Sequence, residues 1–574
     1  MTTISRLLTV AAILACTAGA AIGQGGNSQG GNTATPIKHL VVIFQENVSF
    51  DHYFGTYPSA TNADGTPFTA SSNTPRVNNL STPLDVNNNF KPLAGVDLLH
   101  NNPNKNNSAN NTVAGGMGAV NPFRLSPSQA ITKDQDHGYK DEQLASDGGK
   151  MDLFPLHVGK KGPPPAGSGA VTTNGLVMGY YDGNTVTALW NYAQNYALND
   201  NHYTSVYGPS TPGALDLISG QTNGLDLNNS GPLTFSVVAD GNGNYSVISD
   251  GDPTGDVCSS PTNDHIRMAG RNIGDMLNDQ KITWGWFEGG FNLKITNPNG
   301  STGCTRNSTT TAPAPNPTVT SNDYIPHHQP FQYYASTANP THARPNSVRN
   351  IGYTDPANHQ YDLADFFTAL AAGNLPAVTF LKAAAFEDGH PGYSDPLDEQ
   401  YFLVTVINAL QESPFWSNTA VIILYDDSDG WYDHQMAPVV NPSTSTADAL
   451  NGTGKCNSSG GFQQTTGPTP GTPLNGNSGK PAQGRCGYGT RVPLLAISPW
   501  AKRNYVDHTL VDQSSVIRFI EDNWLSGQRV QRRGSFDTIA GTLNNMFNFE
   551  DQPGDASARK LILDSTSGEV VNVP

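Results

Sequence analysis

The sequence predicts an α/β fold, a mostly parallel sheet sandwiched by helices and carrying long polar loop insertions. Five short runs of apolar, mainly β-branched residues lack polar alternation, as is typical of strands buried on both faces. Helical patterns lie between these runs, and strands that alternate with helices indicate a parallel sheet covered on both faces. Only 36% of the 574 residues are hydrophobic, whereas Gly (59) and Pro (41) are plentiful, which indicates a core wrapped in long loops.

The predicted elements run along most of the chain. Strands are expected at HLVVIF (39–44), KITWGWF (281–287), PAVTFLKA (376–383), TAVIILYD (419–426) and VPLLAIS (492–498). Helices are expected at IRMAGRNIGDMLND (266–279), YDLADFFTALAAG (361–373), DEQYFLVTVINALQES (398–413) and QSSVIRFIEDNWL (513–525). In such a sheet ligands bind beyond the carboxyl ends of the strands, so the residues that follow each strand are the first candidates for a site.

The ends of the chain differ in composition from its middle. Residues 1–23 have one basic residue, an apolar stretch and then small residues, the layout of a secretory signal, so we expect an exported protein, periplasmic or secreted. Cleavage after Gly23 is expected; the alternative is a lipoprotein box, ILAC, with Cys16 as the lipid anchor. The remaining boundaries are a flexible linker at 24–36, one catalytic domain at 37–550 with insertions near 60–130, 222–263, 293–325 and 439–485, and a C-terminal tail at 551–574.

The net charge limits the partners. A formal charge of −17 argues against nonspecific binding to nucleic acid, which requires a basic surface. An anionic substrate would therefore need local positive charge, most simply a bound metal ion.

Four cysteines remain when Cys16 is set aside. Cysteines in an exported protein are expected to form disulfides, and each neighbouring pair brackets a segment rich in Gly, Asn, Ser and Thr. We therefore expect Cys258 to pair with Cys304 and Cys456 with Cys486; the alternative is four free buried thiols. No cysteine or histidine spacing typical of a zinc site is present.

Two of the predicted strands end in acidic residues. Glu46 and Asn47 follow the first strand, and Asp426 and Asp427 follow the fourth, so a parallel sheet would bring both groups to one edge. Clustered carboxylates repel one another unless a cation lies between them, and this oxygen-rich set suits Mg²⁺, Ca²⁺ or Mn²⁺. The alternative is that Glu46 and Asn47 cap a helix and that DDSDG (426–430) is only a turn.

A serine follows in the segment YGPSTP (207–212). Pro212 suits the first position of a helix with Thr211 as its cap, which would place Ser210 just ahead of the helix N-terminus. Free N–H groups there favour an anion, so Ser210 is a candidate nucleophile activated by metal coordination. The alternative is that this serine belongs to an ordinary cap.

Histidines supply further candidates. His390 and His434 each follow a predicted strand end, His327 and His328 lie in DYIPHHQPF, and His137 lies in DQDHGY. Imidazole can bind a phosphate oxygen or protonate a leaving group near neutral pH, although a lone surface histidine needs no function.

Several motifs occur together in a fixed order. They are ENVSFDHYFG (46–55), GGKMDLF (148–154), MGYYDGN (178–184), YGPSTP (207–212), the HH pair (327–328), LP…HP (375–391), YDDSDGWYDH (425–434), GTRVPLLAISPW (489–500) and SSVIRFIEDNW (514–524). As an ordered set they resemble the bacterial phosphoesterase family that contains phosphatidylcholine-type phospholipases C and a respiratory-burst-inhibiting acid phosphatase. This family is a branch of the alkaline phosphatase superfamily, so the resemblance implies an alkaline-phosphatase-like sheet.

The resemblance also implies roles for individual residues. Glu46, Asn47, Asp426 and Asp427 would bind the metal together with Ser210, which would attack phosphorus. His137, His327, His328 and His390 would act in catalysis, and His434 would contact the substrate; we also expect Lys382 to bind substrate. The sequence departs from the family at Val48, where Arg is usual, at Asp427, where Glu is frequent, and after the serine, where an Asn-Arg pair is missing.

The resulting expectation is a metal-dependent phosphoesterase, phospholipase C-like, that forms a covalent phosphoseryl intermediate. Its partners would be a phospholipid or a small phosphate ester, with transient contact at a membrane surface and no nucleic acid. Two alternatives are an acid phosphatase acting on phosphomonoesters and a catalytically silent cell-surface binding protein.

Overall fold

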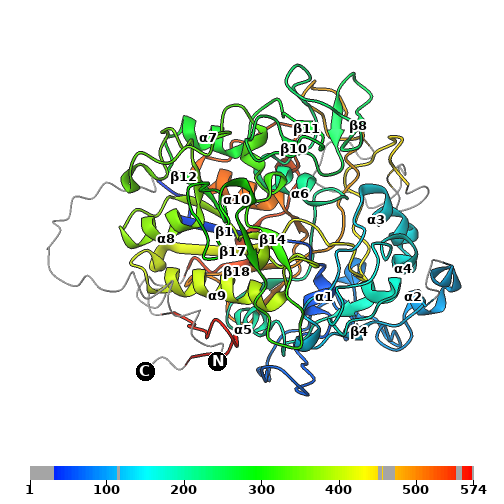
Figure 1. Ribbon diagram of the computed structural model, residues 1–574. Coiled ribbons are helices and arrows are strands. Elements are labelled where there is room, and N and C mark those ends of the chain that lie inside the picture. Colours follow the sequence, from blue (N-terminus) through cyan, green and yellow to red (C-terminus); the bar gives the residue numbers. More distant parts are fainter. Residues whose placement is uncertain (1–31, 113–116, 450–455, 457–471, 551–558, 572–574) are drawn as a thin grey trace.

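An eight-stranded sheet forms the centre of the computed structural model (Figure 1). Its strands lie in the order β15 (Gln360–Asp362), β12 (Trp284–Glu288), β16 (Val378–Lys382), β1 (His39–Gln45), β17 (Thr419–Tyr425), β18 (Leu494–Ile497), β6 (Ala197–Asn199) and β19 (Tyr505–Asp507). Every strand runs in one direction except β18, which is antiparallel to both of its neighbours. The predicted fold class, a mostly parallel sheet, is confirmed.

The structure describes residues 32–112, 117–449, 456, 472–550 and 559–571. The predicted signal sequence, both of its alternative processing sites and most of the predicted linker lie outside these residues. Within the described ranges, no helix combines the length and the apolarity that crossing a membrane requires.

The five predicted strands are present because their side chains are buried on both faces of the sheet. All seven residues of β1 and all seven of β17 are buried. The reversed direction of β18 was not predicted, since an apolar run carries no sign of its direction. Three short strands were also missed: β6, β15 and β19 have three residues each, and β15 consists of the polar run Gln-Tyr-Asp.

Helices cover both faces of the sheet. In Figure 1, α5 (Thr187–Asn195), α8 (Leu363–Ala371) and α9 (Pro396–Glu412) lie on one side, and α6 (Ser210–Ser219), α7 (Ile273–Asp279) and α10 (Ser514–Trp524) lie on the other. On these two sides α5 packs against α9, and α6 packs against α7 and α10. The helix predicted at 266–279 is shorter than expected and starts at Ile273, because Ile266 belongs to β11 (His265–Ile266) and Asn272 caps the helix.

The polar insertions contain small paired strands and the disulfides. One insertion forms β8 (Val237–Ala239) with β9 (Tyr245–Val247), and another forms β13 (Asn307–Thr309) with β14 (Thr320–Asn322). Both predicted disulfides are present, Cys258–Cys304 and Cys456–Cys486. Residues 559–571 of the predicted tail pack on α9, where Asn408 and Gln411 donate hydrogen bonds to the carbonyls of Leu563 and Leu561.

Candidate active site

The carboxyl ends of β1 and β17 lie side by side and carry the predicted acidic residues. The strands pair Gln45 with Tyr425, so Glu46 and Asp426 leave the sheet at the same point. Asn47 has a φ of +61°, a left-handed conformation that asparagine tolerates better than most residues. This turn directs the Asn47 N–H to Asp426 Oδ1 over 2.8 Å, so residues from opposite ends of the chain form one cluster.

Ser210 faces this cluster from the N-terminus of α6. Its Oγ lies 3.1 Å from Glu46 Oε2 and 3.3 Å from Asp427 Oδ2, and its side chain is buried. The predicted start of the helix was wrong by two residues: Ser210 is itself the first helical residue and Pro209 is the N-cap. The Thr211 N–H donates to Asp250 Oδ1 over 2.9 Å, which satisfies one of the free donors of the first turn.

Helix α6 approaches the end of β17 so closely that one position must be glycine. A Cβ on Gly213 would lie 2.2 Å from the Asp426 carbonyl oxygen and 2.8 Å from Gln513 Nε2. Gln513 in turn donates hydrogen bonds to the carbonyls of Tyr425 and Asp426. No larger side chain fits at position 213 unless α6 and the end of β17 move apart.

The cluster is suited to a cation. Asn47 Oδ1 and Asp426 Oδ2 are buried, and neither has a hydrogen-bond partner among the described residues. Burial, together with the Asp426 charge, raises the pKa of Glu46 and of Asp427 well above the ordinary range. Glu46 Oε2 and Asp427 Oδ2 lie next to Ser210 Oγ, and Asn47 and Asp426 add two unpartnered buried oxygens, so a hard divalent ion held here would relieve the repulsion and satisfy those oxygens.

Lys382 supplies an internal positive charge at one side of the cluster. It ends β16 and forms a buried ion pair with Glu46 Oε1. His328 Nδ1 lies 3.4 Å from the same oxygen, and Asp388 is close enough that Glu46, His328 and Asp388 could share one ion. Glu46 belongs to both groups, so the Lys382 ammonium offsets negative charge in each of them. The predicted contact of Lys382 with substrate stays a prediction.

A cavity of about 440 Å³ opens in front of Ser210. Three of the predicted histidines line it, His137, His327 and His390. The rest of the lining is mostly polar or charged and includes Lys133, Asp134, Asp136, Lys161 and Asp250, with Ile325, Pro391 and Tyr393 among the less polar residues. Such a cavity offers both positive and negative groups to a substrate that reaches Ser210.

The surroundings of the four histidines near Ser210 shift their pKa values in different directions. Burial opposes a charge on His137, but Asp427 and Asp429 raise its pKa well above the usual value, and Asp429 Oδ1 lies 3.3 Å from Nδ1. The pKa of His327 is raised, against burial, by Asp250 and Asp252. Burial lowers the pKa of His390 to about 4 and that of His328 well below 6.5. The surroundings therefore favour the protonated form at His137 and His327 and the neutral form at His328 and His390.

His434 lies in a different group of residues. Its Nδ1 is 2.6 Å from Asp51 Oδ2 and its Nε2 is 3.0 Å from Asn78 Oδ1. Arg491 binds both Asp51 and Asp433 beside it. His434 does not line the cavity. Its contact with Asp51 instead holds α1 (Phe50–Phe54) against the loop after β17.

Sequence reasoning missed several residues that support the cluster. Asp388 lies beyond a short 3-10 helix (Ala385–Glu387) that follows β16, so it is not at a strand end and the rule that found Glu46 did not point to it. Asp429 binds both His137 and the Asn47 side-chain amide, which donates over 3.1 Å. Glu142, on α3 (Tyr139–Ser146), accepts from the Gly208 N–H over 3.0 Å and from the Ser428 hydroxyl over 2.7 Å, and no sequence signal pointed to it.

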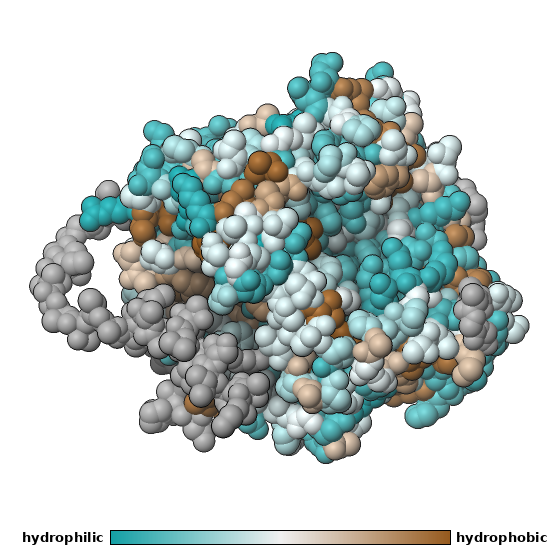
Figure 2. Space-filling model, viewed as in Figure 1, coloured by the Kyte–Doolittle hydropathy of each residue, from teal (hydrophilic) through white to brown (hydrophobic). Residues whose placement is uncertain are grey.

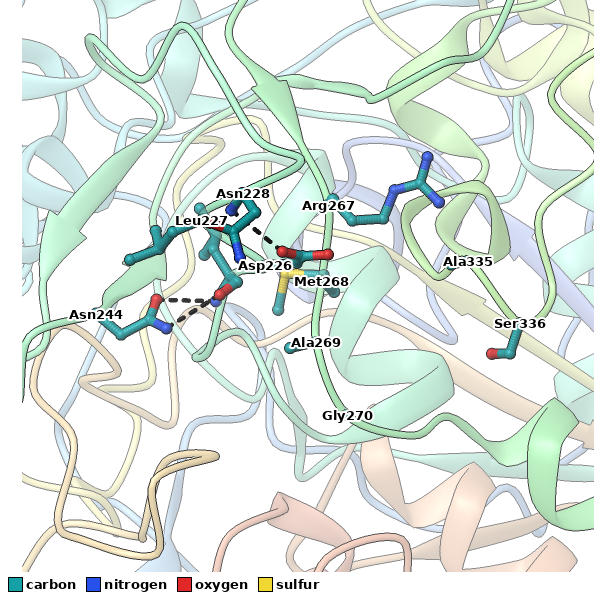
Figure 3. Close-up of a pocket in the computed structure, with 11 residues that line it drawn as sticks. Asp226, Leu227, Asn228, Asn244, Arg267, Met268, Ala269, Gly270, Ala335 and Ser336 are labelled. Atoms are coloured by element: carbon teal, nitrogen blue, oxygen red, sulfur yellow. Dashed lines mark hydrogen bonds between the residues drawn. The ribbon is translucent and has the colours of Figure 1, made fainter.

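A larger cavity of about 610 Å³ lies elsewhere, in the insertion around β11 (Figure 3). Two of its polar side chains bond other lining residues: Asn244 bonds the backbone of Leu225, and Asp226 accepts from the Asn228 N–H. None of the predicted site residues lines this cavity, so the chemistry of the chain is better sought at Ser210.

The chain was compared with known proteins. The model of the Phosphoesterase family matches residues 37–525. A non-hemolytic phospholipase C of Pseudomonas aeruginosa is 31% identical over 193 residues, which cover 31% of this chain and 24% of that protein. Phospholipase C A of Mycobacterium tuberculosis is 23% identical over 542 residues, 90% of this chain and 78% of that one. The chain thus spans about a quarter of the first relative's length and most of the second's.

Among solved structures, murine ectonucleotide pyrophosphatase/phosphodiesterase 5 is similar at 13% identity. The match covers 63% of this chain and 95% of that one, with a TM-score of 0.27.

Proposed function

Because the chain belongs to the Phosphoesterase family, we propose that it is an exported, metal-dependent phosphoesterase, phospholipase C-like, that acts through a covalent phosphoseryl intermediate. The observation that carries this proposal is the position of Ser210. Its hydroxyl faces Glu46 and Asp427 at the start of α6, inside a cavity lined by histidines. Relatives named phospholipase C over 90% of the chain support the substrate class.

In the proposed reaction Ser210 Oγ attacks phosphorus, and its proton passes to the Glu46 or Asp427 carboxylate beside it. The new Oγ–P bond forms as the bond between phosphorus and the leaving oxygen breaks, and water later cleaves the Oγ–P bond to release the phosphate product. Since the Ser210 hydroxyl donates to a carboxylate, its lone pairs are free to face the cavity. A bound divalent ion would stabilise negative charge on the serine oxygen and on the phosphate.

The histidines of the cavity supply protons and positive charge. His137 and His327 have raised pKa values, so they hold a proton near neutral pH. One of them protonates the leaving alcohol, and both offset the charge of the phosphate oxygens. His390 has a pKa lowered to about 4 by burial, so it takes part as a neutral imidazole.

A phosphomonoesterase is the second candidate, because one observation favours it. Most of the residues that line the cavity have charged or polar side chains, and such groups bind a small hydrophilic leaving group better than a diacylglycerol. The insertion at 222–263 favours the lipid instead: Asp250 lines the cavity, and Leu227, Phe235 and Val257 of the same insertion are 45%, 52% and 58% exposed. Figure 2 shows hydrophobic residues over the β8–β11 region, where they would meet a membrane surface.

Export and the disulfides belong together in this proposal. Disulfides persist in oxidising compartments and are rare elsewhere, and two are present, Cys258–Cys304 and Cys456–Cys486. We propose that the protein acts after export, in the periplasm or outside the cell.

The test is hydrolysis of a phosphomonoester and of a choline phosphodiester, side by side, with and without a chelator. Ser210→Ala should lose roughly 10³-fold or more in kcat, whereas Ser219→Ala, in the last turn of the same helix, should keep its activity. Diester cleavage lost with chelator and in Ser210→Ala supports the phospholipase C, and monoester cleavage alone supports the phosphatase. Metal binding without turnover of either ester would overturn both and indicate a silent binding protein.

A further inference from the structure

One residue that lines the cavity has no role in the reaction proposed above, Tyr393. Tyr393 lines the cavity together with Ser210 and His390. Its oxygen is buried and has no hydrogen-bond partner among the described residues. Leaving a buried hydroxyl unpaired costs free energy, so the hydroxyl calls for a partner that the described residues do not provide.

The ring that carries this hydroxyl is held in place. It stacks on the His390 ring with centroids 4.0 Å apart and an interplanar angle of 21°. Three hydrogen bonds fix the loop that carries the ring: Gly389 N–H to Ser394 Oγ (3.0 Å), His390 N–H to Asp388 Oδ1 (2.9 Å) and Ser394 N–H to the His390 carbonyl (2.9 Å). These contacts hold the Tyr393 ring in one orientation before any ligand binds.

The surroundings decide which kind of partner the hydroxyl can take. Asp388, Glu46, Asp426 and Asp134 lie near Tyr393. A phenol keeps its proton near neutral pH, so Tyr393 can act as a donor. A donor in a cavity beside a candidate nucleophile is suited to an oxyanion, and phosphate is the oxyanion of this family's substrates.

An unpaired buried hydroxyl is not by itself a sign of ligand binding. Tyr192 on α5 also has a buried hydroxyl without a partner among the described residues, yet it packs inside the hydrophobic core. Only Tyr393 of these two lines the cavity of Ser210. Comparing the same substitution at the two tyrosines therefore distinguishes a hydroxyl that binds a ligand from one that is simply unpaired in the core.

Resting on the proposed function, we propose that Tyr393 is a further substrate-binding residue whose hydroxyl donates a hydrogen bond to a non-bridging oxygen of the bound phosphate group. His137 and His327 line the same cavity from other segments of the chain. Tyr393 would complete this set of donors from the β16 side.

The experiment compares Tyr393→Phe and Tyr192→Phe with wild type, all loaded with metal. Each change removes one unpaired hydroxyl and keeps the ring. The measurements are the Kd of inorganic phosphate by calorimetry, kcat/KM on a phosphate ester, the thermal midpoint without ligand, and the metal content. Tyr393→Phe should bind phosphate roughly 10- to 100-fold more weakly, as expected for a lost hydrogen bond to a charged group. Its metal content and unliganded thermal midpoint should match wild type.

Tyr192→Phe should match wild type in all four measurements. If Tyr393→Phe binds phosphate within twofold of wild type, or if it loses binding only in proportion to a lower thermal midpoint or metal content, the role assigned to Tyr393 is wrong. These results leave the proposed function intact, because wild type still turns over the ester. If wild type neither binds phosphate nor hydrolyses an ester, the proposed function fails first and the role of Tyr393 fails with it.

Discussion

Gly213→Ala should disturb the candidate metal site without replacing any candidate ligand. The added Cβ would lie 2.2 Å from the Asp426 carbonyl oxygen and 2.9 Å from its carbonyl carbon. A carbon and a carbonyl oxygen normally approach to about 3.3 Å, so α6 and the end of β17 must separate by roughly 1 Å. Ser210 is on α6 and Asp426 follows β17, so the change acts directly on the distance between nucleophile and ligands.

The expected magnitudes differ for stability and for metal binding. Overpacking costs about 1–3 kcal/mol, but alanine favours a helix over glycine by about 1 kcal/mol, so the net loss of unfolding free energy is roughly 0–2 kcal/mol. A site of this kind tolerates displacements of about 0.5 Å. Metal affinity should therefore fall by roughly 10- to 100-fold, as for changes in residues that support metal ligands.

Equilibrium dialysis of the metal and urea unfolding measure these two quantities separately. Ala214→Gly, the neighbouring position on the same helix, is the control: it should lower stability through the loss of a buried methyl and of helix propensity, yet leave metal affinity near wild type. If Gly213→Ala bound metal as tightly as wild type, the close packing of α6 on Asp426 would not position the site, and the reasoning would be refuted.

Three further predictions concern groups around the site. Burial raises the pKa of Glu142 from 4.5 to about 7, so the protonated group stabilises the fold below pH 4.5 and this contribution is lost as the pH rises to 7. Glu142→Gln should gain up to roughly 3 kcal/mol relative to wild type across that window, and unfolding curves parallel at all pH values would contradict it. His434→Asn should lower the unfolding free energy by about 1–3 kcal/mol, because it weakens the contact with Asp51, and should leave kcat/KM unchanged. A loss of activity at unchanged stability would instead indicate that His434 contacts the substrate. Replacing Cys258 and Cys304 by serine should lower the unfolding free energy by about 2–4 kcal/mol and leave activity intact below the new midpoint, and an unchanged midpoint would show that this disulfide is dispensable.

The strand ends were predictable because a parallel sheet has a simple rule. Residues that follow β1 and β17 must meet at one edge, so Glu46 and Asp426 could be placed together although they are far apart in the sequence. The disulfide Cys258–Cys304 was predictable for a similar reason, since exported loops bracketed by cysteines tend to close. In both cases the residues of a short segment were enough to predict which side chains lie together.

Other features depend on packing between segments and have no local sequence signal. The direction of β18 is set by its connections, and the start of α6 at Ser210 by the Pro209 cap and by the contact of Gly213 with Asp426. His434 followed a strand end as His390 did, yet its partner is Asp51 on another loop. The strand-end rule locates an edge of the sheet, and it does not say which way each later loop turns.

The most direct test of the central claim is acid quenching of the metal-loaded enzyme during turnover of a phosphate ester, followed by peptide mass spectrometry. The account predicts one added phosphoryl group, on the peptide that contains Ser210, and its absence in Ser210→Ala and in metal-free protein. A phosphoryl group on any other residue, or steady turnover in Ser210→Ala, would contradict the assignment of Ser210 as the nucleophile.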